Sequence, residues 1–346
     1  MKRLIHIKPA LENRLEHLKE WVTGFETGYI FLTALDLDIF SRLKTPLSAE
    51  ELAALCGLHG DLTRRFLNVL TGMGLLHKKE NRYGLMPETA PFLVKDSPYF
   101  ARYLRPDEKH LSVFMRLKEI LKQGPLNEIP SGQDQKPQFD RASMDWMARV
   151  SLLGRLQTTV KQVISLPEFP RAKKLIDLGG GHGLFGIAFA QENPDLRVVI
   201  FDRPEVIPAT EDHILQYGAA DRVSAMAGDY TRDDFGKDYD IIFEACSFGG
   251  NTSVMQNLLR KISSSLRDNG LFIHLTFTLD NDGKGPIEPL LWDLKNHLVS
   301  DPPWTLMTDE EIFRQLSGTG LKGEQIIDLS ESASGPFRLM ISRKMG

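Results

Sequence analysis

The chain has 346 residues, enough for about two domains of ordinary size, and 42% of them are apolar, which excludes a disordered tail or a disulfide-stapled miniprotein. Its 42 Lys and Arg residues against 46 Asp and Glu residues give a net charge of -4, so no global basic field attracts nucleic acid. Two distant cysteines without C-x-x-C spacing, no bilayer-length apolar run and no signal peptide predict a cytoplasmic protein without a metal site or a membrane partner.

The N-terminal part begins with amphipathic helices. Apolar residues from Leu18 to Leu35 recur at steps of three and four, which predicts a stripe that another surface must cover. We expect a second copy of the chain to cover it, in a twofold homodimer.

The stretch from Pro46 to Leu85 has the order helix, turn, helix and two-stranded ribbon, which is typical of a winged helix. Ser48 and Glu51 have the spacing of a capping box, and Asp61 is the expected cap of the second helix. A winged helix can bind DNA, so a DNA-binding regulator is one alternative. Residues 1–110, however, hold 16 basic and 14 acidic side chains, a net charge of only +2, which argues against a nucleic-acid partner.

Residues 111–170 are expected to form a mainly helical connection, interrupted by a polar loop from Gly124 to Gln138. From residue 171 to 346, short apolar runs alternate with helical stretches, which predicts a parallel sheet wrapped by helices. The expected strands are Lys174 to Leu178, Arg197 to Phe201, Val223 to Ala227, Tyr239 to Phe243, Leu271 to Phe277, Gln325 to Leu329 and Phe337 to Ser342. Asn269 and Gly270 are expected to form a tight turn into the fifth of these strands.

The strongest local motif is a glycine-rich turn between a strand and a helix. Asp177 ends the strand, and Gly179, Gly181 and Gly183 allow a tight turn and a close approach of the backbone to a ligand. Asp202 follows the next strand, 25 residues after Asp177, where a carboxylate can accept hydrogen bonds from a ribose.

Gly228, Asp229 and Tyr230 follow the third strand, so carboxylates and an aromatic ring gather at the edge where open α/β sheets bind ligands. This pattern predicts a nucleoside site. A carboxylate at Asp177 would repel the pyrophosphate of a dinucleotide, whereas S-adenosylmethionine has no phosphate and carries an ammonium group. The residues therefore favour S-adenosylmethionine over NAD.

With these motifs, the sequence resembles the class I S-adenosylmethionine-dependent methyltransferases. Within that class it is most similar to the caffeate and bacterial small-molecule O-methyltransferases, which carry an N-terminal winged-helix dimerisation domain. The markers of the resemblance are Pro46–Leu85, Phe139–Met144, Asp177–Gly183, Phe201–Ile207, Gly228–Tyr230, Trp292–Leu298 and Leu306–Phe313. The resemblance implies an α/β fold, with a Rossmann-like doubly wound domain after an α-helical winged-helix domain.

The same resemblance implies roles for the motif residues. Gly179 and Gly181 would contact the methionyl part of the donor, Asp202 the ribose, and Asp229 with Tyr230 the adenine. Asp177, Gly183 and Arg203 are also expected to bind the donor. A small-molecule methyl acceptor would bind beside the donor. We expect the acceptor to be aromatic or otherwise planar, and its pocket to include Met144, Met147, Cys246, Phe248, Trp292 and His297, although such side chains at helical spacing also suit an ordinary core.

The resemblance does not extend to the residue that serves as the general base in the family. Where the family usually has a lysine and then a histidine after the fourth strand, this sequence has Ala245 and Gly249. Three explanations stay open. His297, one turn from Asp293, replaces the base; or the acceptor is a thiolate, amine or electron-rich carbon that needs no base; or the protein binds the donor without transferring its methyl group.

Overall fold

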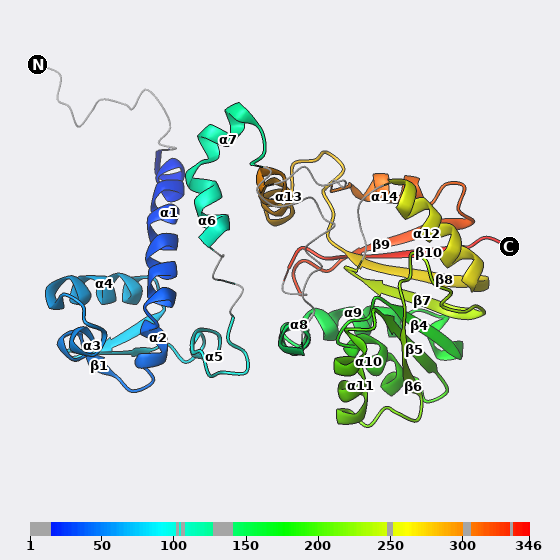
Figure 1. Cartoon of the computed structure of the whole chain (residues 1–346), viewed down its shortest axis with the longest axis horizontal. Coiled ribbons are helices and arrows are strands. Elements are labelled where there is room, and N and C mark those ends of the chain that lie inside the picture. The colour runs from blue at the N-terminus through cyan, green and yellow to red at the C-terminus, as the bar shows by residue number, and fades with distance from the viewer. Residues whose placement is uncertain are drawn as a thin grey trace, which may run out of the picture. The chain divides into compact units, whose positions relative to one another are not determined.

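The computed structural model describes residues 15–101, 104, 108–126, 141–247, 252–299, 306–332 and 335–346. The chain divides into two compact units, Met1–Glu108 and Lys109–Gly346, so residues 111–170 belong to the same unit as the C-terminal part (Figure 1). Within the described ranges, no helix is both long and apolar enough to cross a lipid bilayer.

The first unit combines five described helices with a small antiparallel sheet. The helices are α1 (Leu15–Asp36), α2 (Ile39–Arg42), α3 (Ala49–Cys56), α4 (Gly60–Gly72) and α5 (Ala90–Leu93). The strands β1 (Leu47–Ser48), β2 (Leu76–Lys79) and β3 (Arg82–Leu85) pair in the order β1-β3-β2. Their shared core includes Phe40, Leu52, Leu67 and Tyr83, each at most 1% exposed.

The two predicted helix starts in this unit have different outcomes. Ser48 and Glu51 form the expected capping box at the start of α3, with the Glu51 N–H donating to Ser48 Oγ and the Ser48 N–H to the Glu51 carboxylate. The prediction of Asp61 as a cap is wrong. Helix α4 begins at Gly60 and its cap is His59, two residues before Asp61. Asp61 lies in the first turn, where it pairs with arginines of its own helix.

The second unit is built on a seven-stranded sheet with the order β6-β5-β4-β7-β8-β10-β9. The strands are β4 (Lys174–Leu178), β5 (Arg197–Asp202), β6 (Val223–Ala227), β7 (Tyr239–Ala245), β8 (Leu266–Thr276), β9 (Leu321–Asp328) and β10 (Arg338–Lys344). Strands β4 to β8 are parallel, and β10 is antiparallel to both β8 and β9. This is the doubly wound α/β sheet that the alternating pattern predicted.

Helices cover both faces of this sheet (Figure 1). The described helices of the unit are α6 (Glu108–Met115), α7 (Leu117–Gln123), α8 (Arg141–Ser151), α9 (Arg155–Ile164), α10 (Leu184–Glu192), α11 (Ile207–Gln216), α12 (Thr252–Ser265), α13 (Ile287–Val299) and α14 (Asp309–Gln315). Leu175 of β4 packs in one core with α9, α10 and α11, and Ile176 packs in the opposite core with α12. Adjacent residues of a strand point to opposite faces, so an almost continuously apolar strand supplies both cores.

One predicted turn differs in the structure. Strand β8 begins at Leu266, before Asn269 and Gly270, so these two residues do not separate the strand from the preceding helix. Asn269 has a φ of 62°, and the pairing of β8 with β7 shifts register between Tyr239 and Ile241. The Asn-Gly pair therefore forms an irregularity within a strand.

The strand order places a ligand crevice at the middle of the sheet. The chain runs outward from β4 through β5 to β6, then returns to place β7 on the other side of β4. At such a reversal the loops after neighbouring strands diverge, which opens a crevice at their carboxyl ends. The loops after β4, β5, β6 and β7 all begin at this edge.

Candidate functional site

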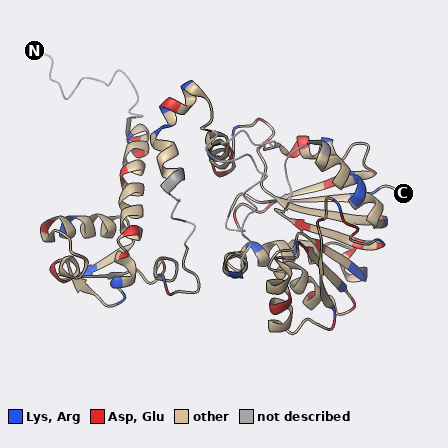
Figure 2. Cartoon of the chain, viewed as in Figure 1, with Lys and Arg blue, Asp and Glu red and all other residues tan. Residues whose placement is uncertain are grey.

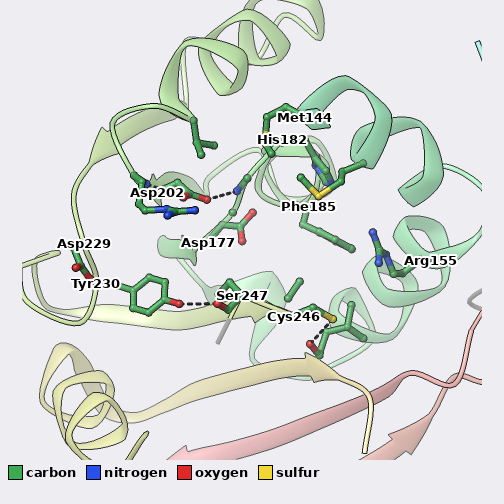
Figure 3. Close-up of a pocket in the computed structure, with 18 of the residues that line it drawn as sticks. Met144, Arg155, Asp177, His182, Phe185, Asp202, Asp229, Tyr230, Cys246 and Ser247 are labelled. Atoms are coloured by element: carbon green, nitrogen blue, oxygen red, sulfur yellow. Dashed lines mark hydrogen bonds between the residues drawn. The ribbon is translucent and has the colours of Figure 1, made fainter. Parts of the chain in front are cut away.

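A cavity of about 550 Å³ opens at the carboxyl ends of β4, β5, β6 and β7 (Figure 3). Its lining comes from these strand ends together with α8, α9, the start of α10 and β8. The lining residues are Met144, Met147, Arg155, Asp177, Gly179, Gly180, Gly181, His182, Phe185, Asp202, Arg203, Val206, Asp229, Tyr230, Thr231, Ala245, Cys246, Ser247 and Leu275.

The glycine loop forms one wall of the cavity with its backbone, and at Gly179 the structure leaves no room for a side chain. Gly179 has a φ of +70°, and a Cβ atom at this position would lie 2.4 Å from Ser247 Oγ. Gly183 is not among the lining residues. It caps the start of α10 with a φ of +77°, and a Cβ there would lie 2.9 Å from Ile200 Cδ1, so its function in the structure is close packing.

Asp177 is completely buried beneath the loop. Its Oδ2 accepts a hydrogen bond of 3.1 Å from the Gly186 N–H, and its Oδ1 is buried without a partner among the described residues. Burial raises the pKa of Asp177 to about 7, against the hydrogen bond from Gly186, and the nearby Asp202 and Glu244 raise the pKa further. A nearby cation would therefore stabilise the ionised form of Asp177.

Asp202 links the end of β5 to the glycine loop. Its Oδ2 accepts from the Gly181 N–H and its Oδ1 from the Arg203 N–H, each at 2.7 Å. Burial raises the pKa of Asp202, and these backbone bonds oppose the rise. A carboxylate offers about four acceptor positions, so both oxygens can accept a further bond from a ligand.

Asp229 and Tyr230 lie at the same end of the cavity, after β6 (Figure 3). Asp229 Oδ1 accepts from the N–H and the hydroxyl of Thr231, and these bonds outweigh burial and lower the pKa of Asp229. The Tyr230 hydroxyl donates to the Ser247 carbonyl at 2.7 Å, which holds the ring against the turn after β7. Two sequence-distant strand ends are joined in this way.

The turn after β7 is held from below by a buried pair. Glu244, fully buried, accepts from the Ser247 N–H and is hydrogen-bonded to Nδ1 of the buried His274 on β8. The Ser247 hydroxyl donates to the Leu178 carbonyl at 3.1 Å. These bonds connect β4, β7 and β8 under the cavity, so the positions of Ser247 and Tyr230 depend on a network rather than on one contact.

The opposite end of the cavity carries Arg155 and His182 among mostly apolar side chains. Met144 and Met147 of α8 face it together with Phe185 of α10 and Leu275 of β8. Cys246 lines the cavity, and its Sγ donates to the Leu275 carbonyl at 3.4 Å. Loss of water around the sulfur and the nearby Glu244 carboxylate raise the pKa of its thiol. Cys246 is therefore a neutral thiol near pH 7.

His182 also lies at this end and is held in one neutral form. Its Nδ1 accepts from the Leu184 N–H at 3.1 Å, which places the ring proton on Nε2, 2.9 Å from Ser151 Oγ. Burial and the neighbouring Arg155 lower the pKa of His182 to about 3. Both ring nitrogens are engaged, so His182 is not available to accept a proton from a ligand.

Several residues predicted for the site do not line this cavity. Trp292, Asp293 and His297 lie on α13, where Trp292 packs edge-on against Phe277. His297 Nδ1 donates to the Asp293 carbonyl oxygen at 2.9 Å, while the Asp293 carboxylate is 3.6 Å away. The catalytic roles of His297 and Asp293 stay predictions. Phe248, also predicted for the acceptor pocket, and Gly249 lie outside the described residues.

The sequence alone did not indicate Arg155, Phe185 and Leu275 as site residues, although all three line the cavity. They come from three different elements and carry no motif, so only the tertiary packing reveals them. In the part of the chain that the structure describes, no group of three His, Cys, Asp or Glu side chains is arranged to hold a metal ion.

Comparison with known proteins follows the same two-part division. An O-methyltransferase domain model matches residues 132–318, and an O-methyltransferase dimerisation domain model matches residues 20–95. An uncharacterized protein of Methanocaldococcus jannaschii is 32% identical and covers 88% of this chain and 83% of its own length. The tetracenomycin polyketide synthesis 8-O-methyl transferase of Streptomyces glaucescens is 28% identical over 93% of this chain and 94% of its own length.

Solved structures show the same fold along nearly the whole chain. The structure of PigF with SAH has a TM-score of 0.79 and 20% identity, and covers 97% of this chain and all of that one. Human N-acetylserotonin methyltransferase in complex with SAM has a TM-score of 0.75 and 17% identity, covering 98% of this chain and all of that one. The chain thus belongs to the O-methyltransferase family, enzymes that use S-adenosylmethionine as methyl donor and carry an N-terminal dimerisation domain.

Proposed function

We propose that the cavity binds S-adenosylmethionine with its adenosine beside Asp202, Asp229 and Tyr230 and its methionyl group beside the glycine loop. The observation that carries this proposal is the convergence of four strand ends on one cavity. Asp202 has acceptor positions left for the two ribose hydroxyls. The unpaired Oδ1 of Asp177 supplies an acceptor for the methionyl ammonium.

The methyl acceptor, in this proposal, is a small planar molecule at the apolar end of the same cavity. Met144, Met147 and Phe185 offer the flat, polarizable contacts that suit an aromatic ring. The donor supplies an activated methyl group, and the protein aligns the acceptor's nucleophile with it.

We further propose that the acceptor reacts without a histidine at the family position, where this chain has Gly249. Two side chains at the acceptor end support this view: His182 is neutral with both nitrogens engaged, and Cys246 is a protonated thiol. A thiolate, an amine or an electron-rich carbon attacks the methyl carbon without prior removal of a proton by a base. One relative, 26% identical, is the L-tyrosine C(3)-methyltransferase of Streptomyces lavendulae.

The first unit is proposed to form a homodimer on a winged-helix scaffold. Helix α1 leaves Leu18, Trp21, Val22, Phe25 and Tyr29 more than 60% exposed in the single chain. A contiguous apolar face of this kind is characteristic of a protein interface. The match to the dimerisation domain, residues 20–95, includes most of this face and supports a second copy of the chain as the partner.

The donor site is tested by calorimetry with S-adenosylhomocysteine, the product of the donor. Asp202→Ala should weaken binding at least tenfold, about 1.4 kcal/mol or more, because it removes charge-assisted bonds to the ribose. Asp195→Ala is the matched control, since Asp195 is exposed and pairs with Lys173 away from the cavity. Equal affinity of the wild type and Asp202→Ala would refute the assignment.

Methyl transfer is tested separately, with methyl-labelled S-adenosylmethionine and a panel of planar phenols, aromatic amines and thiols. We expect a labelled product together with S-adenosylhomocysteine. Donor binding without transfer to any class would favour the alternative of a donor-binding protein that has lost transfer. Salt-dependent retention on DNA would favour a winged-helix regulator, and the small net charge of residues 1–110 predicts that it is negligible.

A further inference from the structure

Arg155 is a cation at the end of the cavity opposite the predicted adenosine site. It is the first residue of α9, and Figure 3 shows its guanidinium directed into the cavity, with Asp177 between it and Asp202. Asp229 and Tyr230 line the far end. The cavity therefore has nucleoside-binding groups at one end and a guanidinium at the other.

The guanidinium is held in place by neighbours that are not acidic. Its Nη2 donates to Ser151 Oγ at 2.6 Å, and the group lies over the Phe337 ring, 5.2 Å from the ring centroid. The Ser151 hydroxyl gives its own proton to the Met147 carbonyl, so its oxygen can accept from both Arg155 and His182. These contacts orient the guanidinium without neutralising it.

The charge of Arg155 has no counter-ion among the residues that the structure describes. Among those residues Arg155 contacts the Ser151 hydroxyl and the Phe337 ring rather than a carboxylate, and its buried Nε has no hydrogen-bond partner. A guanidinium with unpaired donors in a partly buried position favours an anion with planar, bidentate geometry, such as a carboxylate. The cavity is thus lined by the carboxyl group of Asp177, whose buried Oδ1 has no partner among the described residues, and by the guanidinium of Arg155, which has no counter-ion among them.

We propose that Arg155 binds the α-carboxylate of the methionyl group of S-adenosylmethionine, while Asp177 faces its ammonium. This inference rests on the proposed donor site. A zwitterionic amino-acid group satisfies both charges at once, in the order in which the cavity presents them from the adenosine end. Arg155 is thus a binding residue that no sequence motif indicates.

The other basic side chains that line the cavity, Arg203 and His182, do not suit this role. Arg203 follows Asp202 at the ribose end, and its guanidinium lies 3.6 Å from Glu205. His182 is neutral at pH 7, because its pKa is about 3. The competing assignment is that Arg155 binds an anionic group of the methyl acceptor, and the experiment below distinguishes the two.

The test is a thermodynamic cycle between Arg155 and the ligand carboxylate. Calorimetry compares S-adenosylhomocysteine, its decarboxylated analogue and 5′-methylthioadenosine, which lacks the whole amino-acid end, on the wild type and Arg155→Met. We expect Arg155→Met to weaken the binding of S-adenosylhomocysteine about 10- to 100-fold. Binding of the other two ligands should weaken less than about threefold. Removing the carboxylate from the ligand should lower the affinity of the wild type by a similar factor. The same change should lower the affinity of Arg155→Met only slightly.

Arg149→Met is the matched control, because Arg149 is exposed on the neighbouring helix α8 and does not line the cavity. Arg155→Lys keeps the charge without the planar fork and should show a smaller loss, confined to S-adenosylhomocysteine. Should Arg155→Met fail to fold, Arg155→Lys and the wild-type comparison of the three ligands carry the test.

The outcomes separate the two proposals. Equal losses for all three ligands, or no loss for any, would overturn the assignment of Arg155. An unchanged affinity for S-adenosylhomocysteine with a loss of acceptor methylation would overturn it in favour of acceptor binding. Failure of the wild type to bind any of the three ligands would instead refute the proposed donor site.

Discussion

Replacing Asp177 by asparagine should stabilise the folded protein at high pH and weaken binding of the donor. The side chain is 0% exposed, its Oδ1 has no partner among the described residues, and burial raises its pKa from 3.8 to about 7. Asparagine has nearly the same shape and keeps an oxygen that accepts from the Gly186 N–H. The substitution therefore removes mainly the buried charge.

The magnitude follows from the shift of the pKa. The folded state keeps the proton of Asp177 up to about pH 7, whereas the unfolded state releases it near pH 3.8, so this group lowers stability as pH rises between these values. At about 1.4 kcal/mol per pH unit, the cost of the buried charge reaches ~4 kcal/mol above pH 7. Asp177→Asn should therefore raise the free energy of unfolding by much of this amount at pH 8 and by almost nothing at pH 4.

The assay is urea unfolding of the wild type and Asp177→Asn at pH 4 to 8, without ligand. Asp195→Asn is the control with the opposite sign, because a hydrogen bond from Lys173 lowers the pKa of exposed Asp195. A stability difference between wild type and Asp177→Asn that does not change with pH would refute the reasoning.

Donor binding gives a second readout of the same group. The ammonium of the ligand favours ionised Asp177, so affinity of the wild type for S-adenosylhomocysteine should fall as pH decreases below 7, by up to about tenfold per unit. Asp177→Asn should bind about tenfold more weakly at pH 8 and lose most of this dependence. An affinity that rises as pH decreases below 7 would contradict an ammonium at Asp177.

Three further predictions concern catalysis, the glycine loop and assembly. His297→Ala should retain most of kcat if the acceptor needs no base, and loss of turnover with intact donor binding would make His297 the base instead. Gly179→Ala should destabilise the fold by about 1–3 kcal/mol and weaken donor binding, because its φ is +70° and the new Cβ would lie 2.4 Å from Ser247 Oγ; unchanged thermal unfolding would contradict this. Phe25→Glu, on the exposed face of α1, should shift the mass measured by light scattering from dimer to monomer, and an unchanged dimer would place the interface elsewhere.

Elements with strong local signals were predicted well. Strand β4 has the predicted bounds, Lys174–Leu178, and the helix from Ala49 begins at the predicted capping box. In both cases neighbouring residues determine the conformation: glycines follow the strand, and a side-chain oxygen caps the helix. The prediction of the α4 cap was wrong because His59 and Asp61 are both able to accept a hydrogen bond. Which of the two caps the helix depends on where the helix begins.

The acceptor pocket stays a prediction. Of the residues expected in it, Met144, Met147 and Cys246 line the described cavity, whereas Trp292 and His297 lie on α13 and do not. The resemblance placed the helix that carries Trp292 and His297 along the acceptor pocket, but sequence spacing does not determine which way a helix face points. That orientation depends on packing, and Leu298 and Val299 of this helix pack against Val113 and Ile120.

The sequence by itself determined the α/β class, the order of strands and helices, and the residues Asp177, Asp202, Asp229 and Tyr230 at successive strand ends. It could do so because strand, turn and helix signals are local, and because parallel strands bring their carboxyl ends to one edge. Only the tertiary structure decided that α9 directs Arg155 into the same cavity and that His182 is a neutral partner of Ser151. Those contacts join residues from different helices, and burial sets their protonation, so no local pattern in the sequence encodes them.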